Sequence, residues 1–199
     1  MTAGRAAVFF DRDGTLNEEV DFLTTPEQLR LIQGASTAVR SLNTRGFSVC
    51  IISNQSAVAR GLLSEADLVP IHRKLTRELG RDGAHIDRIY YCPHHPTAGI
   101  APYNVECECR KPRPGMLQRA AEELSLYLPG SYVVGDRIVD VQVARAVGAR
   151  AILVLTGYGM TALNDCRSQG VKPDFIAASA REAVEFILET DKGDHHQHD

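Results

Sequence analysis

The clearest signal in this chain is the stretch FFDRDGTLN, residues 9–17. Two aspartates, Asp11 and Asp13, follow directly after a short apolar run and are separated by one residue. Residues i and i+2 of an extended segment point the same way. Two like charges at that spacing repel each other unless a cation lies between them or one is protonated. The stretch therefore predicts a buried strand that ends in a cation site, with a calcium-type turn or a solvated acidic loop as alternatives.

Further apolar runs of the same kind recur along the chain. Together with the first, they cover residues 6–10, 47–53, 86–92, 131–136, 150–156 and 174–179. Their short length and their β-branched and aromatic content favour strands. Stretches with helical periodicity lie between them, at 34–46, 64–80, 115–128, 139–149 and 179–190, and we expect Pro70 to bend or delay the second. This alternation predicts an α/β fold, a Rossmann-like doubly wound parallel sheet with helices on both faces.

A sheet of this kind binds ligands beyond the carboxyl ends of its strands. Polar side chains with useful chemistry follow four of the predicted strands: Asp11 and Asp13, Ser53 and Asn54, Cys92 and His94, and Asp136. Three carboxylates that converge at one edge indicate a Mg²⁺ site, because this ion prefers hard oxygen ligands. We therefore expect a catalytic magnesium centre at that edge.

A second group of metal-binding residues follows the third predicted strand. Cys92 and His94, and then Cys107 and Cys109, are each spaced by one residue. Three thiolates and one imidazole make a closed tetrahedral zinc set, and closed sets are structural because a catalytic zinc keeps one position open. His95 is the alternative imidazole ligand, while unrelated buried thiols and a nucleic-acid-binding zinc ribbon are alternative interpretations of the whole cluster. We expect a structural Zn²⁺ that orders the loop between the two pairs.

The length and net charge of the chain indicate how many domains it has and which kinds of partner are not expected. The 199 residues predict one domain over residues 1–190, followed by a polar C-terminal tail at 191–199. A net charge of −3 argues against a nucleic-acid partner, which would favour a basic face. No apolar run approaches the roughly 20 residues that span a bilayer, so we expect no membrane partner. We expect a cytoplasmic monomer, in which the thiols stay reduced.

Four short motifs occur in order along the chain: DRDGT at 11–15, SNQ at 53–55, RKP at 110–112 and GDRIVD at 135–140. In this order they resemble the four motifs of the haloacid dehalogenase (HAD) superfamily of phosphatases. The resemblance implies that Asp11 is a nucleophile that forms an aspartyl-phosphate and that Asp13 is the acid and base. It implies further that Ser53 hydrogen-bonds the phosphoryl group and that Lys111 neutralises it. Mg²⁺ would be held by Asp11, the Asp13 carbonyl and Asp136.

Two further motifs, CPHH…CECRKP and NQSAVARG, resemble the heptose bisphosphate phosphatases within that superfamily. This resemblance implies a phosphatase without a separate cap domain, which removes the 7-phosphate of a small phosphorylated sugar. Histidinol-phosphate phosphatases share the zinc loop and remain an alternative, as does a zinc-stabilised binding protein with a dead phosphatase fold. Without a cap, loops must recognise the sugar. The expected substrate-binding residues are Glu19, Asp21, Phe22, Asn54, Gln55, Ser56, Arg60, Arg110 and Arg137.

Arg110 has a specific predicted role among these residues. A bisphosphate carries a second anionic group that needs its own cation. The planar fork of an arginine suits phosphate oxygens, so Arg110 is the expected partner of that second phosphate.

Overall fold

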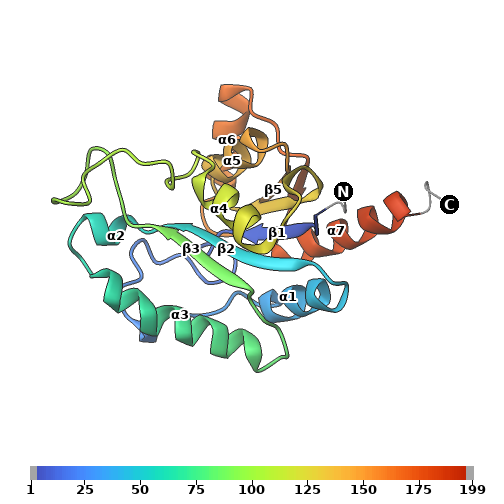
Figure 1. Cartoon of the computed structure of the whole chain (residues 1–199), viewed down its shortest axis with the longest axis horizontal. Helices are drawn as coiled ribbons and strands as arrows, with labels where there is room; N and C mark the ends of the chain where they lie inside the picture. The colour runs from blue at the N-terminus through green and yellow to red at the C-terminus, as the bar shows by residue number, and fades with distance from the viewer. Residues whose placement is uncertain (1–3, 196–199) are drawn as a thin grey trace.

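The computed structural model of the chain describes residues 4–195 and has a parallel sheet at its centre (Figure 1). Within those residues, six strands pair in the order β3-β2-β1-β4-β5-β6, and every pairing is parallel. The strands are β1 Ala7–Phe10, β2 Ser48–Asn54, β3 Arg88–Cys92, β4 Tyr132–Gly135, β5 Arg150–Val154 and β6 Phe175–Ala177. Their ends differ from the predicted apolar runs by at most two residues. The predicted doubly wound sheet is therefore confirmed.

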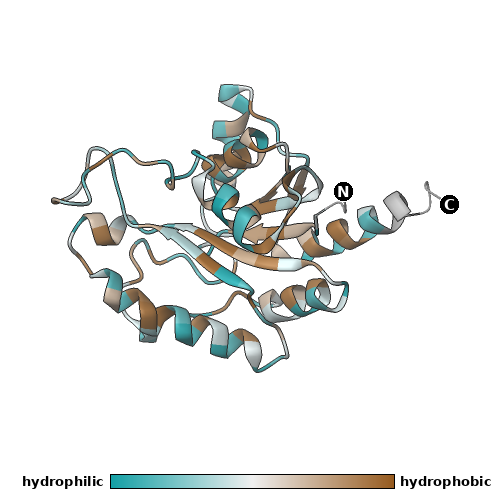
Figure 2. Ribbon diagram, viewed as in Figure 1, coloured by the Kyte–Doolittle hydropathy of each residue, from teal (hydrophilic) through white to brown (hydrophobic). Residues whose placement is uncertain are grey.

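Helices cover both faces of the sheet. They are α1 Ala35–Thr44, α2 Ser56–Ala59, α3 Glu65–Gly80, α4 Gly115–Leu124, α5 Ile138–Ala146, α6 Gly159–Gln169 and α7 Ala180–His195, with short 3-10 turns η1 Pro26–Gln28 and η2 Leu128–Gly130. Helices α1, α3 and α7 pack on the face that carries Phe10, whereas α4, α5 and α6 pack on the face that carries Phe9. Successive strand residues point to opposite faces, so these two neighbours belong to different halves of the core. Figure 2 shows the hydrophobic strands between the two helical layers.

Helix α3 begins earlier than a proline in its first turns would suggest. Ser64 caps it: the Ser64 hydroxyl accepts from the backbone N–H of Asp67, and the Asp67 carboxylate accepts from the N–H of Ser64. This reciprocal capping stabilises the start of the helix. The expectation that Pro70 delays the helix is therefore wrong, because Pro70 lies inside a helix that already begins at Glu65.

Two helices were not predicted from the sequence, and one extends further than expected. Helix α2 is only four residues long, which is too short to produce an apolar pattern. Helix α6 buries only the small residues Gly159, Ala162 and Cys166, so its apolar pattern is weak. Helix α7 continues through residues 191–195, which were predicted to be tail. The rest of the predicted tail, 196–199, lies outside the described residues.

The topology places a crevice at the carboxyl ends of β1 and β4, the two central strands. The chain leaves these strands toward opposite halves of the sheet, and ligands bind where such a switch occurs. Within residues 4–195, the longest connections (11–34 and 93–114) contain no second folded domain, so no cap domain is evident. The connection 93–114 is the long green loop that extends from the sheet in Figure 1. Of the helices in residues 4–195, not one combines the length and apolar content that a membrane span requires.

Candidate active site

A carboxylate centre lies at the carboxyl ends of β1 and β4, and its members are Asp11, Asp136 and Asp140, whereas the sequence predicted Asp11, Asp13 and Asp136. Asp11 follows β1, Asp136 follows β4, and Asp140 lies in the first turn of α5. Each offers an oxygen within 4.8 Å of the others, and all three residues are at most 6% exposed. The backbone N–H of Asp11 donates to the carbonyl of Val134 at 2.9 Å, which joins the two strand ends. The fold thus brings Asp11 against two buried carboxylates, Asp136 and Asp140, that lie more than a hundred residues further along the sequence.

This centre fits a divalent cation bound by oxygen. The Oδ2 atom of Asp136 accepts from the N–H of Tyr158 at 2.8 Å, but its buried Oδ1 has no hydrogen-bond partner among the described residues. Burial, with the charges of Asp11 and Asp140, raises the pKa of Asp136 to about 8, and burial raises the pKa of Asp11 to about 6. A bound cation would relieve this repulsion, and carboxylate oxygens are ligands that Mg²⁺ prefers. The residues present therefore fit the predicted magnesium site.

Two glycines leave the space that Asp136 occupies. Gly14 has φ +76° and Gly157 has φ +55°, and a Cβ atom on either would lie 2.2 Å from Asp136 Oδ2. Glycine adopts positive φ without strain and has no Cβ atom to clash. The hydroxyl of Thr156 also donates to the carbonyl of Gly14 at 2.6 Å, which holds the two loops together. The glycine of the DRDGT motif therefore makes room for a carboxylate from another strand.

Lys111 lies directly beside Asp11. Its Nζ atom is 3.0 Å from Asp11 Oδ1, 2.6 Å from Asp140 Oδ1 and 2.8 Å from the carbonyl oxygen of Ile52. An ammonium has three donors, so these three acceptors satisfy it. Burial alone would lower the pKa of Lys111, but Asp11 and Asp140 outweigh burial and raise it. Asn54 exchanges two hydrogen bonds with the Lys111 backbone, at 3.0 and 3.1 Å, so we infer that Asn54 positions this lysine.

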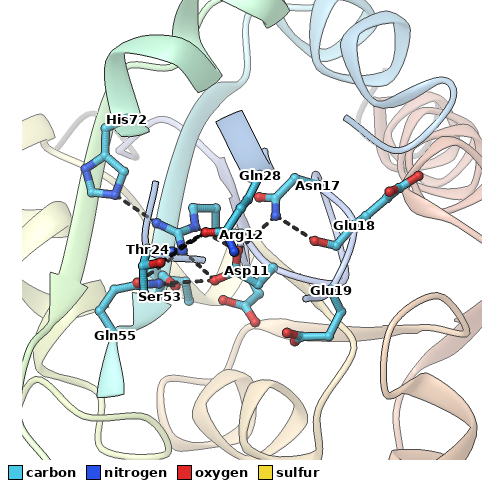
Figure 3. A network of polar contacts seen from close by, with 12 residues as sticks. Asp11, Arg12, Asn17, Glu18, Glu19, Thr24, Gln28, Ser53, Gln55 and His72 are labelled. Carbon is cyan, nitrogen blue, oxygen red and sulfur yellow. Dashed lines mark hydrogen bonds and ion pairs between the residues drawn. The ribbon is translucent and has the colours of Figure 1, made fainter. Parts of the chain in front are cut away.

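Asp13 is held by a polar network that includes Arg12, Asn17 and Gln55, three residues that Figure 3 shows close together. The Nε and Nη2 atoms of Arg12 donate to its two oxygens at 3.0 and 2.7 Å, and the amides of Asn17 and Gln55 donate at 2.9 and 3.2 Å. Burial raises the pKa of Asp13, but Arg12 and these hydrogen bonds outweigh burial and lower it. Gln55 also donates to Ser53 Oγ at 2.7 Å, so its amide serves two predicted catalytic residues. We therefore infer a positioning role for Gln55 also.

The predicted zinc ligands lie together in the connection after β3. The Sγ atom of Cys107 is 3.4 Å from that of Cys92 and 3.3 Å from that of Cys109, and none of the three thiols is in a disulfide. The Nδ1 atom of His94 is 3.8 and 3.5 Å from the sulfurs of Cys92 and Cys109. His95 uses its own Nδ1 to accept from two backbone N–H groups of its loop. The donor set fits a tetrahedral zinc ion bound by three sulfurs and His94.

All the predicted catalytic and substrate-binding residues line one cavity of about 790 Å³. Arg110 reaches it from the loop of the thiol cluster. Its Nη1 atom donates to the carbonyl of His94 at 2.9 Å, and both terminal nitrogens lie 3.2 Å from the hydroxyl of Ser56. The Arg110 guanidinium is therefore held partly by a residue of the predicted zinc site.

Two arginines, Arg60 and Arg110, line the cavity together with His95. Burial, followed by the charges of Arg110 and Arg60, lowers the pKa of the half-buried His95, so the three side chains lie within electrostatic reach of one another. The Arg60 guanidinium also lies 5.6 Å from the ring centroid of Phe22, in the loop after the nucleophile. This arrangement is suited to an anionic group of the ligand.

The loop after the nucleophile and the connection after β5 meet at the cavity. Arg137 lies 3.5 Å from Glu19, and its guanidinium stacks 3.9 Å from the ring centroid of Tyr158. The Tyr158 hydroxyl donates to Asp21 at 2.6 Å. Burial and the charge of Asp13 raise the pKa of Glu19. These contacts bring together the predicted residues Glu19, Asp21 and Arg137, and Tyr158 from a third segment joins them.

Three residues of the site were missed by sequence reasoning: Arg12, Asn17 and Tyr158. Arg12 and Asn17 lie within the stretch FFDRDGTLN, and both are fully buried. A charged residue directly after an apolar strand indicates a residue of a polar site, because a buried charge needs partners. Tyr158 follows β5, whose carboxyl end is at the same edge of the sheet as those of β1 and β4. It could have been found by extending the search to that strand end.

Comparison with known proteins agrees with the motifs. The family model "HAD-hyrolase-like" matches residues 108–183. The D-glycero-beta-D-manno-heptose-1,7-bisphosphate 7-phosphatase of Yersinia pestis is 38% identical over 173 residues, which cover 86% of this chain and 92% of the relative. The D-glycero-D-manno-heptose-1,7-bisphosphate 7-phosphatase of Thermosynechococcus vestitus is 41% identical over 187 residues, which cover 92% and 95%.

A solved structure supports the same relationship. The D,D-heptose 1.7-bisphosphate phosphatase from B. bronchiseptica, complexed with magnesium and phosphate, superposes with a TM-score of 0.81 at 34% identity. The match covers 93% of this chain and 99% of that one. The sequence-based resemblance is therefore confirmed: the chain belongs to the D-glycero-D-manno-heptose-1,7-bisphosphate 7-phosphatase family, within the HAD-type phosphatases.

Proposed function

We propose that this chain removes the 7-phosphate of D-glycero-D-manno-heptose 1,7-bisphosphate through an aspartyl-phosphate on Asp11. The observation that carries the proposal is the 3.0 Å contact between Asp11 and the buried ammonium of Lys111, at a cavity lined by arginines. A carboxylate is a competent covalent nucleophile, and a cation beside it can neutralise the phosphate that it attacks. The names of the relatives support this substrate.

The proposed reaction has two steps. An oxygen of Asp11 attacks phosphorus, the bond from phosphorus to the sugar oxygen breaks, and Asp13 gives that oxygen a proton. A water oxygen then attacks phosphorus, its proton goes to Asp13, and phosphate leaves Asp11. Lys111 and the Ser53 hydroxyl orient and neutralise the phosphoryl group in both steps. Mg²⁺ held by Asp11, the Asp13 carbonyl and Asp136 would offset the repulsion between the attacking carboxylate and the phosphate oxygens.

Arg110 is proposed to bind the 1-phosphate. It lies in a cationic part of the cavity and its orientation is set by Ser56 and the carbonyl of His94. Zn²⁺ bound to the thiol cluster would hold this segment, so that less side-chain freedom is lost when the phosphate binds. The cluster's unbridged thiols favour the reducing cytoplasm as the setting.

The test is a comparison of substrates with the purified chain and Mg²⁺. Phosphate release from the α and β anomers of the heptose bisphosphate should exceed release from histidinol phosphate, and the 1-phosphate should remain on the product. Faster release from histidinol phosphate would favour that alternative function and overturn the heptose assignment. The absence of phosphate release from every substrate would contradict phosphatase activity itself.

Arg110→Ala tests the second-phosphate site. The variant should lose about tenfold to a hundredfold in kcat/KM on the bisphosphate, because a hydrogen bond to a charged group contributes about 1.5–3 kcal/mol. A heptose monophosphate should lose much less. Arg113→Ala is the matched control, because Arg113 is in the same loop but pairs with exposed Glu106 and Glu108. Equal losses on both substrates would remove Arg110 from phosphate recognition.

A further inference from the structure

The carboxylate of Asp13 has its acceptor positions filled by neighbouring donors. Oδ1 accepts from Arg12 Nε at 3.0 Å and Asn17 Nδ2 at 2.9 Å, and Oδ2 accepts from Arg12 Nη2 at 2.7 Å and Gln55 Nε2 at 3.2 Å. A carboxylate offers about four lone-pair positions. The orientation of Asp13 is thus determined from two sides, and Arg12 supplies half of the contacts.

Arg12 is itself fixed in place. It is fully buried, with Nη1 at 3.3 Å from His72 Nε2 in α3 and Nη2 donating to Gln55 Oε1 at 3.0 Å. Because a guanidinium only donates, the Nε2 atom of His72 is the acceptor in this contact. Figure 3 shows Arg12 between His72 and Gln55, so its position depends on both α3 and the segment after β2.

We propose that Arg12, held by His72, is a positioning residue for phosphoryl transfer that aims the Asp13 carboxylate at the oxygen to be protonated. This inference rests on the proposed phosphatase function. Arg12 is 0% exposed. Asp13 and Gln55 line the cavity, whereas Arg12 is not among its lining residues. Arg12 therefore acts through Asp13 and does not touch the substrate.

The network also indicates which contact is exchanged during the reaction. Asp13 must free one lone pair to accept a proton from water. The amide of Gln55 makes the longest of the four contacts, and its nitrogen is shared with Ser53 at 2.7 Å. The bidentate contacts from Arg12 can therefore persist while Gln55 releases Asp13. The two parallel hydrogen bonds from a planar guanidinium keep the carboxylate oriented through this exchange. The ammonium of a lysine would contact the carboxylate at one point and would not fix its orientation.

Arg12→Lys tests the proposal because it keeps the charge and loses the fork. On the heptose bisphosphate, whose leaving oxygen needs a proton, kcat should fall by about 100-fold with KM nearly unchanged, in the range of general acid catalysis. On p-nitrophenyl phosphate, whose leaving group departs as a phenolate, a rapid-mixing experiment should show p-nitrophenolate formed in the first turnover at close to the parent rate. Equal losses on the two substrates in that first turnover would overturn the positioning role.

His72 supplies a second test in a residue that is distant from the chemistry. His72→Leu removes the acceptor for Arg12 and should lower kcat about tenfold on the bisphosphate, whereas His72→Gln keeps an acceptor and should restore most of it. If both variants keep the parent kcat, or if Gln fails to rescue a fully folded protein, the link through Arg12 is refuted. Urea unfolding of every variant identifies losses that are due to misfolding. A parent chain that releases no phosphate would contradict the proposed function, whereas an active parent with a fully active Arg12→Lys variant would contradict only this inference.

Discussion

Replacement of Asp140 by asparagine should destabilise the fold by about 3 kcal/mol. Asp140 is 2% exposed, and its two oxygens have different partners. Oδ1 lies 2.6 Å from the ammonium of Lys111, and Oδ2 accepts from the backbone N–H of Arg137 at 3.0 Å, at the start of α5. An asparagine has one acceptor oxygen, so with the side chain in the same place one of these donors loses its partner.

The magnitude comes from the burial of the ion pair. Removal of one partner of a buried pair costs about 3–5 kcal/mol, because the other charge stays away from water. We expect the lower end, because Lys111 retains Asp11 at 3.0 Å and because the loss of the Asp140 charge relieves part of its repulsion with Asp11 and Asp136. With a urea m-value of about 3 kcal/mol per molar for a chain of this size, the unfolding midpoint should fall by about 1 M.

Urea unfolding without added magnesium measures this shift. The chain has no tryptophan, so far-UV circular dichroism is the appropriate signal. Glu185→Gln is the control: it removes one charge from an exposed pair with Arg181 at 3.0 Å, which should change the free energy of unfolding by less than about 0.5 kcal/mol. If Asp140→Asn moves the midpoint no further than this control does, the buried ion pair does not stabilise the fold as argued.

The other predictions concern the nucleophile, the thiol cluster and His72. Asp11→Asn should abolish turnover with an unchanged circular dichroism spectrum, because an amide is not a competent nucleophile; appreciable steady phosphate release would exclude Asp11 from that role. Cys107→Ala should lose its zinc in elemental analysis and part of its activity as the Arg110 loop loosens, whereas an unchanged zinc content would refute the site. Burial and the charge of Arg12 lower the pKa of His72 from 6.5 to about 4, so the stability due to neutral His72 is present above pH 6.5 and is lost as the pH falls toward 4. His72→Gln should therefore flatten the fall in urea midpoint between pH 6.5 and 4; parallel curves for the two proteins would contradict this assignment.

Much of the fold could be predicted because its signals are local. Each strand is a short apolar run, and the alternation of Phe9 and Phe10 between two halves of the core follows from the two-residue period of a strand. The start of α3 shows the limit of a single-residue rule. Pro70 has the wrong geometry for a helix interior, yet the capping by Ser64 and Asp67 and the burial of Leu68 and later residues outweigh it. Helix α6 was missed because the residues it buries are small.

The predicted zinc ligands show what spacing alone leaves open. Cys92, Cys107 and Cys109 are evident in the sequence, but His94 and His95 are adjacent and either could complete the set. Hydrogen bonding decides between them: Nδ1 of His95 is occupied by backbone N–H groups of its own loop, whereas Nδ1 of His94 faces the sulfurs. This choice depends on backbone geometry, which the sequence pattern does not specify.

The sequence by itself determined the doubly wound sheet, the carboxylates Asp11 and Asp13 at a strand end, and the chemistry expected of them. These follow from hydrophobic periodicity and from motifs of fixed local spacing. Only the tertiary structure decided that Asp140 pairs with Lys111 and that Arg12 reaches Asp13, Gln55 and His72 at once. The physical reason is that a buried charge must find partners wherever the packing of distant segments supplies them, and no local pattern records that choice.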